Sequence, residues 1–140
     1  MRNKLRVMWL ADDCELFTEN LENLLGEEGL VHGELCTPVL METMDPLLYD
    51  VFVIDASQNT PCWGSNKCSY VSDYLRSVNP NLFVIGTSLM SSMFHRPDSD
   101  GYTAYYDERI ARTLNPKENL SEKVYRAIKN KGLISGDGKR

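Results

Sequence analysis

The sequence predicts an α/β fold in which helices cover both faces of a parallel sheet. Two short runs, residues 51–54 and 82–86, are apolar without alternating polar residues, as in strands that are buried on both faces. Other stretches place apolar residues on one helical face, as Phe17, Leu21 and Leu24 do. Strands and helices that alternate in units of this length build parallel sheets.

The first half of the chain alternates strands with helices. Gly26 and Gly29 mark the end of the first helix, and Pro38 stands where the second helix would start. The Asp45-Pro46 pair ends or kinks that second helix. The predicted order is a strand at residues 5–10, a helix at 15–28, a strand at 31–36, a helix at 39–48 and a strand at 51–54.

The second half continues the alternation around two longer connections. Residues 56–65 are rich in Ser, Asn, Pro and Gly, which predicts a loop, and we expect a second loop after residue 88. The predicted order is a helix at 66–78, a strand at 82–86, a helix at 103–109, a strand at 110–114 and a last helix that Gly132 ends. Residues 104–106 offer a rival position for the fifth strand.

Five strand–helix units fit a flavodoxin-like (βα)5 doubly wound parallel sheet with strand order 2-1-3-4-5. The chain has 140 residues, which is enough for one domain with a substantial core. We expect this domain to span residues 1–132. The remaining residues, 133–140, are mostly small or polar and are expected to form a flexible tail.

Composition and charge exclude several classes of protein. The net charge of −5 argues against direct binding of nucleic acid, because phosphate contacts need Lys and Arg. No apolar run approaches the roughly 20 residues that span a bilayer, and the basic start lacks the apolar core of a signal peptide. We therefore expect a cytoplasmic protein with no membrane contact. Its four cysteines form no C-x-x-C pair, so reduced thiols are favoured over zinc or disulfide sites.

Polar side chains follow several of the predicted strands. Asp12 and Asp13 come after the first strand, Asp55 after the third, and Thr87 and Ser88 after the fourth. Each acid alone has a simpler interpretation as a helix cap or a turn residue. In the order 2-1-3-4-5, however, the first and third strands are neighbours, so the three acids converge and repel one another. A hard cation such as Mg²⁺ relieves that repulsion, and a hydroxyl beside it can hold a phosphoryl oxygen.

This arrangement resembles the receiver domain of two-component response regulators, over essentially the whole chain. The residues that carry the resemblance are Asp12, Asp13, Asp55 and Thr87 at their strand ends. It implies that Asp55 accepts a phosphoryl group from a phosphohistidine of a sensor histidine kinase or a phosphotransfer protein. The domain would then change conformation and signal to a downstream protein target.

The resemblance also implies a magnesium site and a switch residue. Asp13, Asp55 and the backbone carbonyl of Ser57 would hold Mg²⁺, with Asp12 acting through water. Thr87, with Ser88 beside it, would bind the phosphoryl group and couple it to movement of the following loop and helix. Such a domain is a signalling module and not an enzyme.

The sequence departs from receiver domains near the fifth strand. Receivers usually place a Lys before a Pro at the end of that strand, whereas this chain has Asn115 before Pro116. Asn115 can donate a hydrogen bond but carries no charge. The aromatic switch position, three residues earlier, falls on Arg112, which is a candidate replacement for the missing cation.

Two other functions remain open. A degenerate receiver would act as a phosphorylation-independent interaction module or homodimer, which the Asn115 departure favours. A small Mg²⁺-dependent hydrolase or phosphotransferase is the third possibility. It is disfavoured because Ser57 stands where phosphatases of this kind place a second Asp, and because the chain has no Gly-rich phosphate loop.

Overall fold

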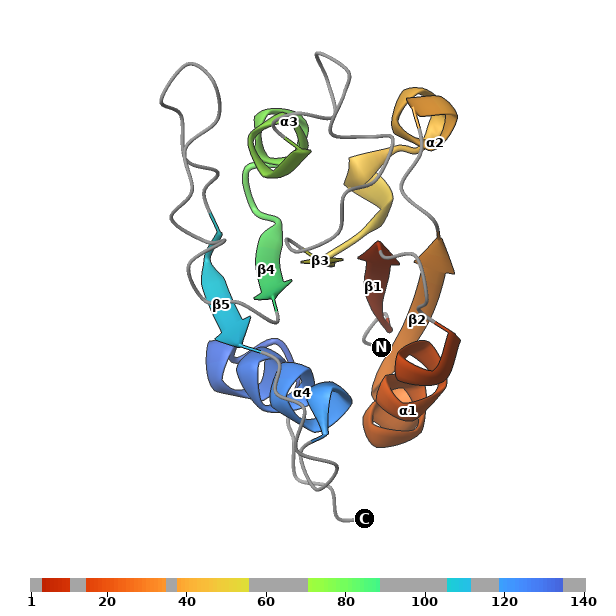
Figure 1. Ribbon diagram of the computed structural model, residues 1–140, viewed down its shortest axis with the longest axis vertical. Coiled ribbons are helices and arrows are strands. Elements are labelled where there is room, and N and C mark those ends of the chain that lie inside the picture. Colours follow the sequence, from red (N-terminus) through yellow and green to blue (C-terminus); the bar gives the residue numbers. More distant parts are fainter. Residues whose placement is uncertain are drawn as a thin grey trace.

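The computed structural model contains one five-stranded sheet in which every neighbouring pair of strands is parallel. The structure describes residues 4–10, 15–34, 38–55, 71–88, 106–111 and 119–134. The strands follow the order β2-β1-β3-β4-β5, so the predicted doubly wound fold is confirmed (Figure 1). They span Leu5–Leu10 (β1), Gly29–Glu34 (β2), Val51–Asp55 (β3), Phe83–Ser88 (β4) and Glu108–Ala111 (β5).

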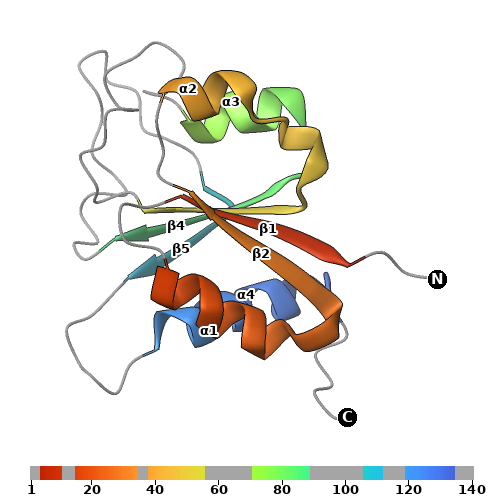
Figure 2. The same cartoon turned by 90° about the vertical axis from the view of Figure 1, so that its right-hand side faces the viewer.

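Helices cover both faces of this sheet, with α1 and α4 on one side and α2 and α3 on the other (Figure 2). The α-helices of the described residues are α1 (Glu15–Leu25), α2 (Pro38–Thr43), α3 (Val71–Val78) and α4 (Leu120–Lys131). Two 3-10 helices, η1 (Gly26–Glu28) and η2 (Pro46–Leu48), follow α1 and α2. Within the described residues, no helix has the length and apolar character that crossing a membrane requires.

Alternate residues of the central strands contribute their side chains to two separate apolar cores. On β3, Val51 and Val53 pack with α1 and α4, whereas Phe52 and Ile54 pack on the opposite face with Leu75 of α3. All of these side chains are almost fully inaccessible to solvent. Because successive side chains of a strand point to opposite faces, a one-residue slip would exchange the two sets. The strand register is therefore firmly fixed.

The helix ends lie where residues that favour a cap or a turn predicted them. Gly26 adopts φ 61° directly after α1, and Gly132 adopts φ 88° at the end of α4, a backbone conformation that glycine tolerates best. The Asp45 side chain accepts a hydrogen bond from the Leu47 backbone N–H at 3.0 Å, which begins η2 beside Pro46. Asn119 caps α4 in the same way. α2 thus ends at Thr43, before the Asp45-Pro46 pair that was predicted to end or kink it, and Pro46 begins η2.

The outer edge of β2 is partly covered by a side chain from α1. The Val31 backbone N–H donates to a carboxylate oxygen of Glu22 at 3.3 Å. β2 pairs with β1 alone, so this N–H belongs to the side of the strand that has no neighbouring strand in the sheet. One of the free donors of this edge strand is therefore satisfied within the domain.

The predicted helix at 103–109 is wrong. Tyr106 and Asp107 are not helical, and β5 begins at Glu108, two residues before the predicted strand at 110–114. The Asp107 backbone N–H donates to the Val84 carbonyl at 2.8 Å, so this segment already pairs with β4. The rival position of the fifth strand, 104–106, is also wrong at Tyr106, because this residue lies before the first residue of β5. A helix was predicted where the chain in fact enters the sheet beside β4.

Asp107 connects three elements at the start of β5. Its carboxylate accepts the Val84 backbone N–H at 2.8 Å and pairs with Arg76 of α3 at 2.7 Å. The pair is mostly buried, with side-chain exposures of 31% and 16%. These contacts connect α3, β4 and β5 at the amino end of β5.

Smaller differences concern element ends. β2 begins at Gly29, two residues before the predicted strand, and β4 continues through Thr87 and Ser88. At the other end of the chain, Ile134 is buried in the core with α4, two residues beyond the expected end of the domain. The expected flexibility of the tail stays a prediction, since residues 135–140 lie outside the described part of the chain.

We predict that Asp107→Ala lowers the free energy of unfolding by about 2–3 kcal/mol, because it leaves both the Val84 N–H and Arg76 without this acceptor. Arg76→Ala should cost less, because it leaves the backbone hydrogen bond of Val84 intact. The exposed His32–Glu34 pair is the control, and His32→Ala should cost no more than about 0.5 kcal/mol. Urea denaturation measures all three values. Equal losses for Asp107→Ala and His32→Ala would contradict the assigned role of Asp107.

Candidate functional site at the carboxyl edge of the sheet

The carboxyl ends of the strands meet at one edge of the sheet because every pair of strands is parallel. β1 and β3 are neighbours there, with Leu10 in register with Ile54. This is the edge at which open α/β sheets bind ligands, beside the point where the strand order reverses. The site is therefore built from the residues that end β1, β3, β4 and β5.

Asp55 is the last residue of β3, and its backbone is in register with Thr87 of β4. The four residues before Asp55 are buried on both faces of the sheet, which holds the strand rigidly in place. Thr87 is in register with Ile110 of β5 on its other side. The structure thus brings together the predicted phosphoacceptor position and the predicted switch position on adjacent strands.

Thr87 is a buried polar residue, with 1% of its surface exposed. Among the described residues, no group accepts a hydrogen bond from its hydroxyl. An unpaired hydroxyl in such a position costs about 1–3 kcal/mol. A ligand oxygen at this edge of the sheet would provide the missing partner.

The other predicted site residues lie outside the described part of the chain. Asp12 and Asp13 follow the last described residue of β1, Ser57 follows Asp55 by two positions, and Arg112 and Asn115 follow β5. Their predicted convergence therefore stays a prediction. Ser88 is described in its backbone, which is in register with Ala111.

The donor set that the sequence assigns to this edge fits a hard cation. Asp12, Asp13, Asp55 and the Ser57 carbonyl would all present oxygen atoms, which Mg²⁺ prefers. Within the described residues there is no cluster of three potential metal ligands.

Tyr106 is a residue near the site that the sequence analysis did not single out. It is buried, and its ring lies against Gly86, the residue before Thr87, so closely that a Cβ at Gly86 would be 2.7 Å from the ring. The Arg109 guanidinium lies 5.9 Å from the centre of the same ring. A glycine inside a buried strand indicates such a close approach, and Gly86 was the available signal.

The sequence matches no protein-family model and no curated protein. Solved structures do resemble it. DrrB, an OmpR/PhoB homologue from Thermotoga maritima, shares 17% identity with a TM-score of 0.59, over 92% of this chain and 54% of the DrrB chain. HP1043, an orphan response regulator of H. pylori, shares 18% identity with a TM-score of 0.55, over 90% and 98% of the two chains.

Two further structures extend this likeness. The BeF3-activated DrrB receiver domain gives a TM-score of 0.58 at 15% identity, over 91% of this chain and 97% of that domain. A putative pilus assembly protein (CpaE) from Burkholderia thailandensis gives 0.55 at 16% identity, over 89% and 98%. The resemblance that Asp12, Asp13, Asp55 and Thr87 suggested is thus confirmed for the overall architecture. The chain has the fold of a response regulator receiver domain.

Proposed function

We propose that the chain is a phosphoacceptor signalling domain, in which Asp55 takes a phosphoryl group from a phosphohistidine of a sensor histidine kinase or phosphotransfer protein. The observation that carries this proposal is the register of Asp55 with Thr87, whose buried hydroxyl has no acceptor among the described residues. A phosphoryl oxygen on Asp55 would supply that acceptor. The carboxyl edge of a parallel sheet is also where a ligand of this kind is expected.

The reaction needs positioning and neutralisation of charge more than a strong base. A carboxylate oxygen of Asp55 attacks phosphorus in line as the bond from phosphorus to the histidine nitrogen of the donor breaks, which leaves an acyl phosphate. Asp12, Asp13, Asp55 and the Ser57 carbonyl would hold Mg²⁺, which neutralises charge on the transferring group. The protein acts as an acceptor that is modified, and not as an enzyme that turns over a substrate.

The signal would pass from Asp55 through β4. The phosphoryl group adds negative charge and strong acceptor atoms, which draw the Thr87 hydroxyl into a new hydrogen bond. Gly86 directly precedes Thr87 and is in contact with the Tyr106 ring. A shift of β4 at this point therefore changes the packing of Tyr106, and a downstream protein target would read the altered surface. This function belongs in the cytoplasm, where such kinases expose their phosphohistidine.

We propose that Arg112 supplies the positive charge that receivers usually take from a lysine. β5 ends at Ala111, in register with Ser88 of β4, and Arg112 is the next residue in the chain. Asn115 is three residues farther, about 10 Å along an extended chain. The early start of β5 thus favours Arg112 over Asn115, although sequence spacing alone had matched Asn115 to the lysine.

A degenerate receiver that binds a partner or a second copy without phosphorylation is the second candidate. The absence of a lysine at Asn115 favours it. The two functions differ in their dependence on Asp55, because only the first requires that carboxylate to react.

The first test is intact mass after incubation with Mg²⁺ and acetyl phosphate. We expect the wild type to gain one phosphoryl group and Asp55→Asn to gain none. Asp50→Asn is the matched control, because Asp50 directly precedes the same strand at its other end and the amide oxygen can still accept the Arg6 backbone N–H. A folded wild type that gains no mass would contradict the proposal and favour the degenerate module.

Thr87→Val tests the buried hydroxyl, since valine keeps the shape of the side chain. We expect the free energy of unfolding to stay constant or to rise by about 1 kcal/mol, because an unpaired polar group is removed. Phosphoryl uptake should slow up to about tenfold, because a typical hydrogen bond contributes about 0.5–1.5 kcal/mol. Uptake that is unchanged would contradict the role of Thr87.

Ser121→Ala is the control for Thr87→Val. Ser121 is the other buried residue of the described chain with an aliphatic hydroxyl, and it donates to the Phe17 carbonyl at 3.1 Å. Its loss should cost about 1 kcal/mol of stability and leave phosphoryl uptake unchanged.

Replacing Arg112 tests the source of the cation. Arg112→Gln should slow uptake from acetyl phosphate about tenfold, and Arg112→Lys should restore most of the rate, because one charge-assisted contact is lost and regained. Asn115→Ala should leave the rate unchanged. The reverse pattern, with Asn115 essential and Arg112 dispensable, would indicate that Asn115 takes the place of the receiver lysine.

A further inference from the structure

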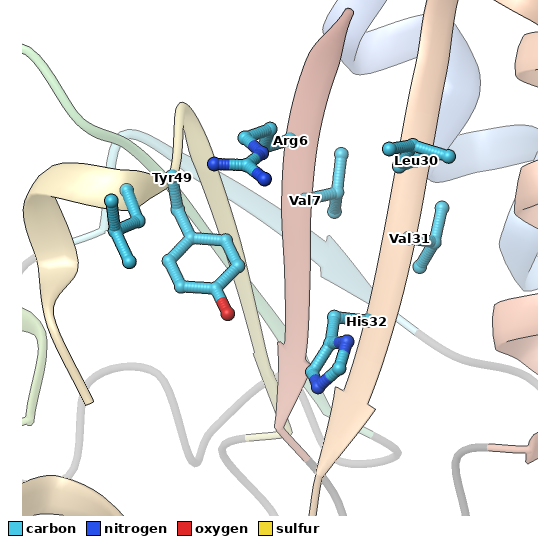
Figure 3. Close-up of a pocket in the computed structure, with 7 residues that line it drawn as sticks. Arg6, Val7, Leu30, Val31, His32 and Tyr49 are labelled. Atoms are coloured by element: carbon cyan, nitrogen blue, oxygen red, sulfur yellow. The ribbon is translucent and has the colours of Figure 1, made fainter. Parts of the chain in front are cut away.

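A pocket of about 140 Å³ lies near the amino end of β1, away from the carboxyl edge. It is formed by residues of β1, β2, the end of η2 and Tyr49, and Figure 3 shows their side chains. The residues that matter here are Arg6, Leu30, His32, Leu48 and Tyr49. Arg6 is four residues before Leu10, about 13 Å along the strand, so the pocket is separate from the site around Asp55.

The apolar part of the pocket is open to solvent. Leu30 is 44% exposed and Leu48 is 52% exposed, and both line the pocket. Leu47, next to Leu48, is 63% exposed. α2 ends at Thr43, and it is followed by the short η2 (Pro46–Leu48), to which both Leu47 and Leu48 belong. Single exposed leucines are ordinary, but Leu30 and Leu48 line the same pocket and give it an apolar wall.

The polar part of the pocket offers hydrogen-bond donors. Among the described residues, no carboxylate pairs with the Arg6 guanidinium, and no group bonds the Tyr49 hydroxyl. Figure 3 shows the Arg6 guanidinium beside Tyr49 and the Tyr49 hydroxyl directed toward His32. Burial raises the pKa of Tyr49, with Arg6 opposing and Glu34 reinforcing the shift, so this phenol stays protonated and can donate.

The two nearby acids are already engaged. Asp50 accepts the Arg6 backbone N–H at 2.9 Å, and Glu34 lies 3.0 Å from His32 Nε2. Among the described side chains that line the pocket, the guanidinium and the phenol therefore remain without a partner, and both donate. An acceptor with negative charge is the chemical complement of this pair.

We propose that this pocket binds a small organic monocarboxylate that carries one branched aliphatic or aromatic group. Arg6 and Tyr49 would hold the carboxylate, and Leu30 and Leu48 would flank the apolar group. The volume sets the size of the ligand, because a cavity of about 150 Å³ accepts benzene, whereas pockets for drug-sized ligands run from about 300 Å³. A nucleotide is therefore too large.

The test is a titration of the whole chain, followed by backbone amide NMR. The probe is N-acetyl-leucine, which carries a carboxylate and a branched side chain, and the matched probe is the neutral N-acetyl-leucinamide. We expect saturable shifts confined to residues 6–8, 30–32 and 48–50, with an affinity in the millimolar range. The affinity of the neutral amide should be lower by a factor of about five or more. This comparison needs no variant and therefore does not depend on the folding of a mutant.

Two arginine variants locate the charge. Arg6→Gln should lower the affinity for N-acetyl-leucine about fivefold, so that it equals the affinity for the neutral amide. Arg126→Gln is the control, because Arg126 is an exposed arginine of α4 on the other face of the sheet, and it should change nothing. Equal binding of the two probes, shifts centred on other residues, or the absence of saturable shifts would each overturn the proposal. Phosphorylation of Asp55 plays no part in these measurements, so their outcome is independent of the proposed signalling function.

Discussion

Burial of the central strands on both faces is the constraint on which the rest of the structure depends. β3 contributes Val51 and Val53 to one core and Phe52 and Ile54 to the other, so its register has no freedom. The same register fixes Asp55 against Thr87 at the carboxyl edge. Apolar residues that never meet a ligand therefore determine where the candidate site lies, and a parallel sheet that could slip would not align those two positions.

Much of the architecture was predictable because the signals were local. The uninterrupted apolar run at 51–54 indicated a doubly buried strand, and Pro46 and Gly132 indicated helix ends that the structure places within a residue or two. Asp55 and Thr87 were predictable as a pair because the strand order follows from alternating units. Their mutual register, however, comes from packing across the sheet and is visible only in the structure.

The region before β5 was predicted wrongly because its conformation depends on contacts distant in sequence. Asp107 is held by Val84 and by Arg76, which is 31 residues away in the chain. Tyr106 takes its position because Gly86 leaves space for the ring. The local sequence pattern reveals neither effect, because it does not show which residue of another strand is the partner.

The hydrogen bond from Val31 to Glu22 has a consequence for how this domain meets other molecules. An edge strand with free donors is a template on which a further strand can add, and uncontrolled addition leads to aggregation. Glu22 occupies one such donor and sets a negative charge along the rim of the sheet. Addition of a strand from a second copy at this point of β2 would have to displace the Glu22 carboxylate, so the domain carries its own protection against growth of the sheet at this edge.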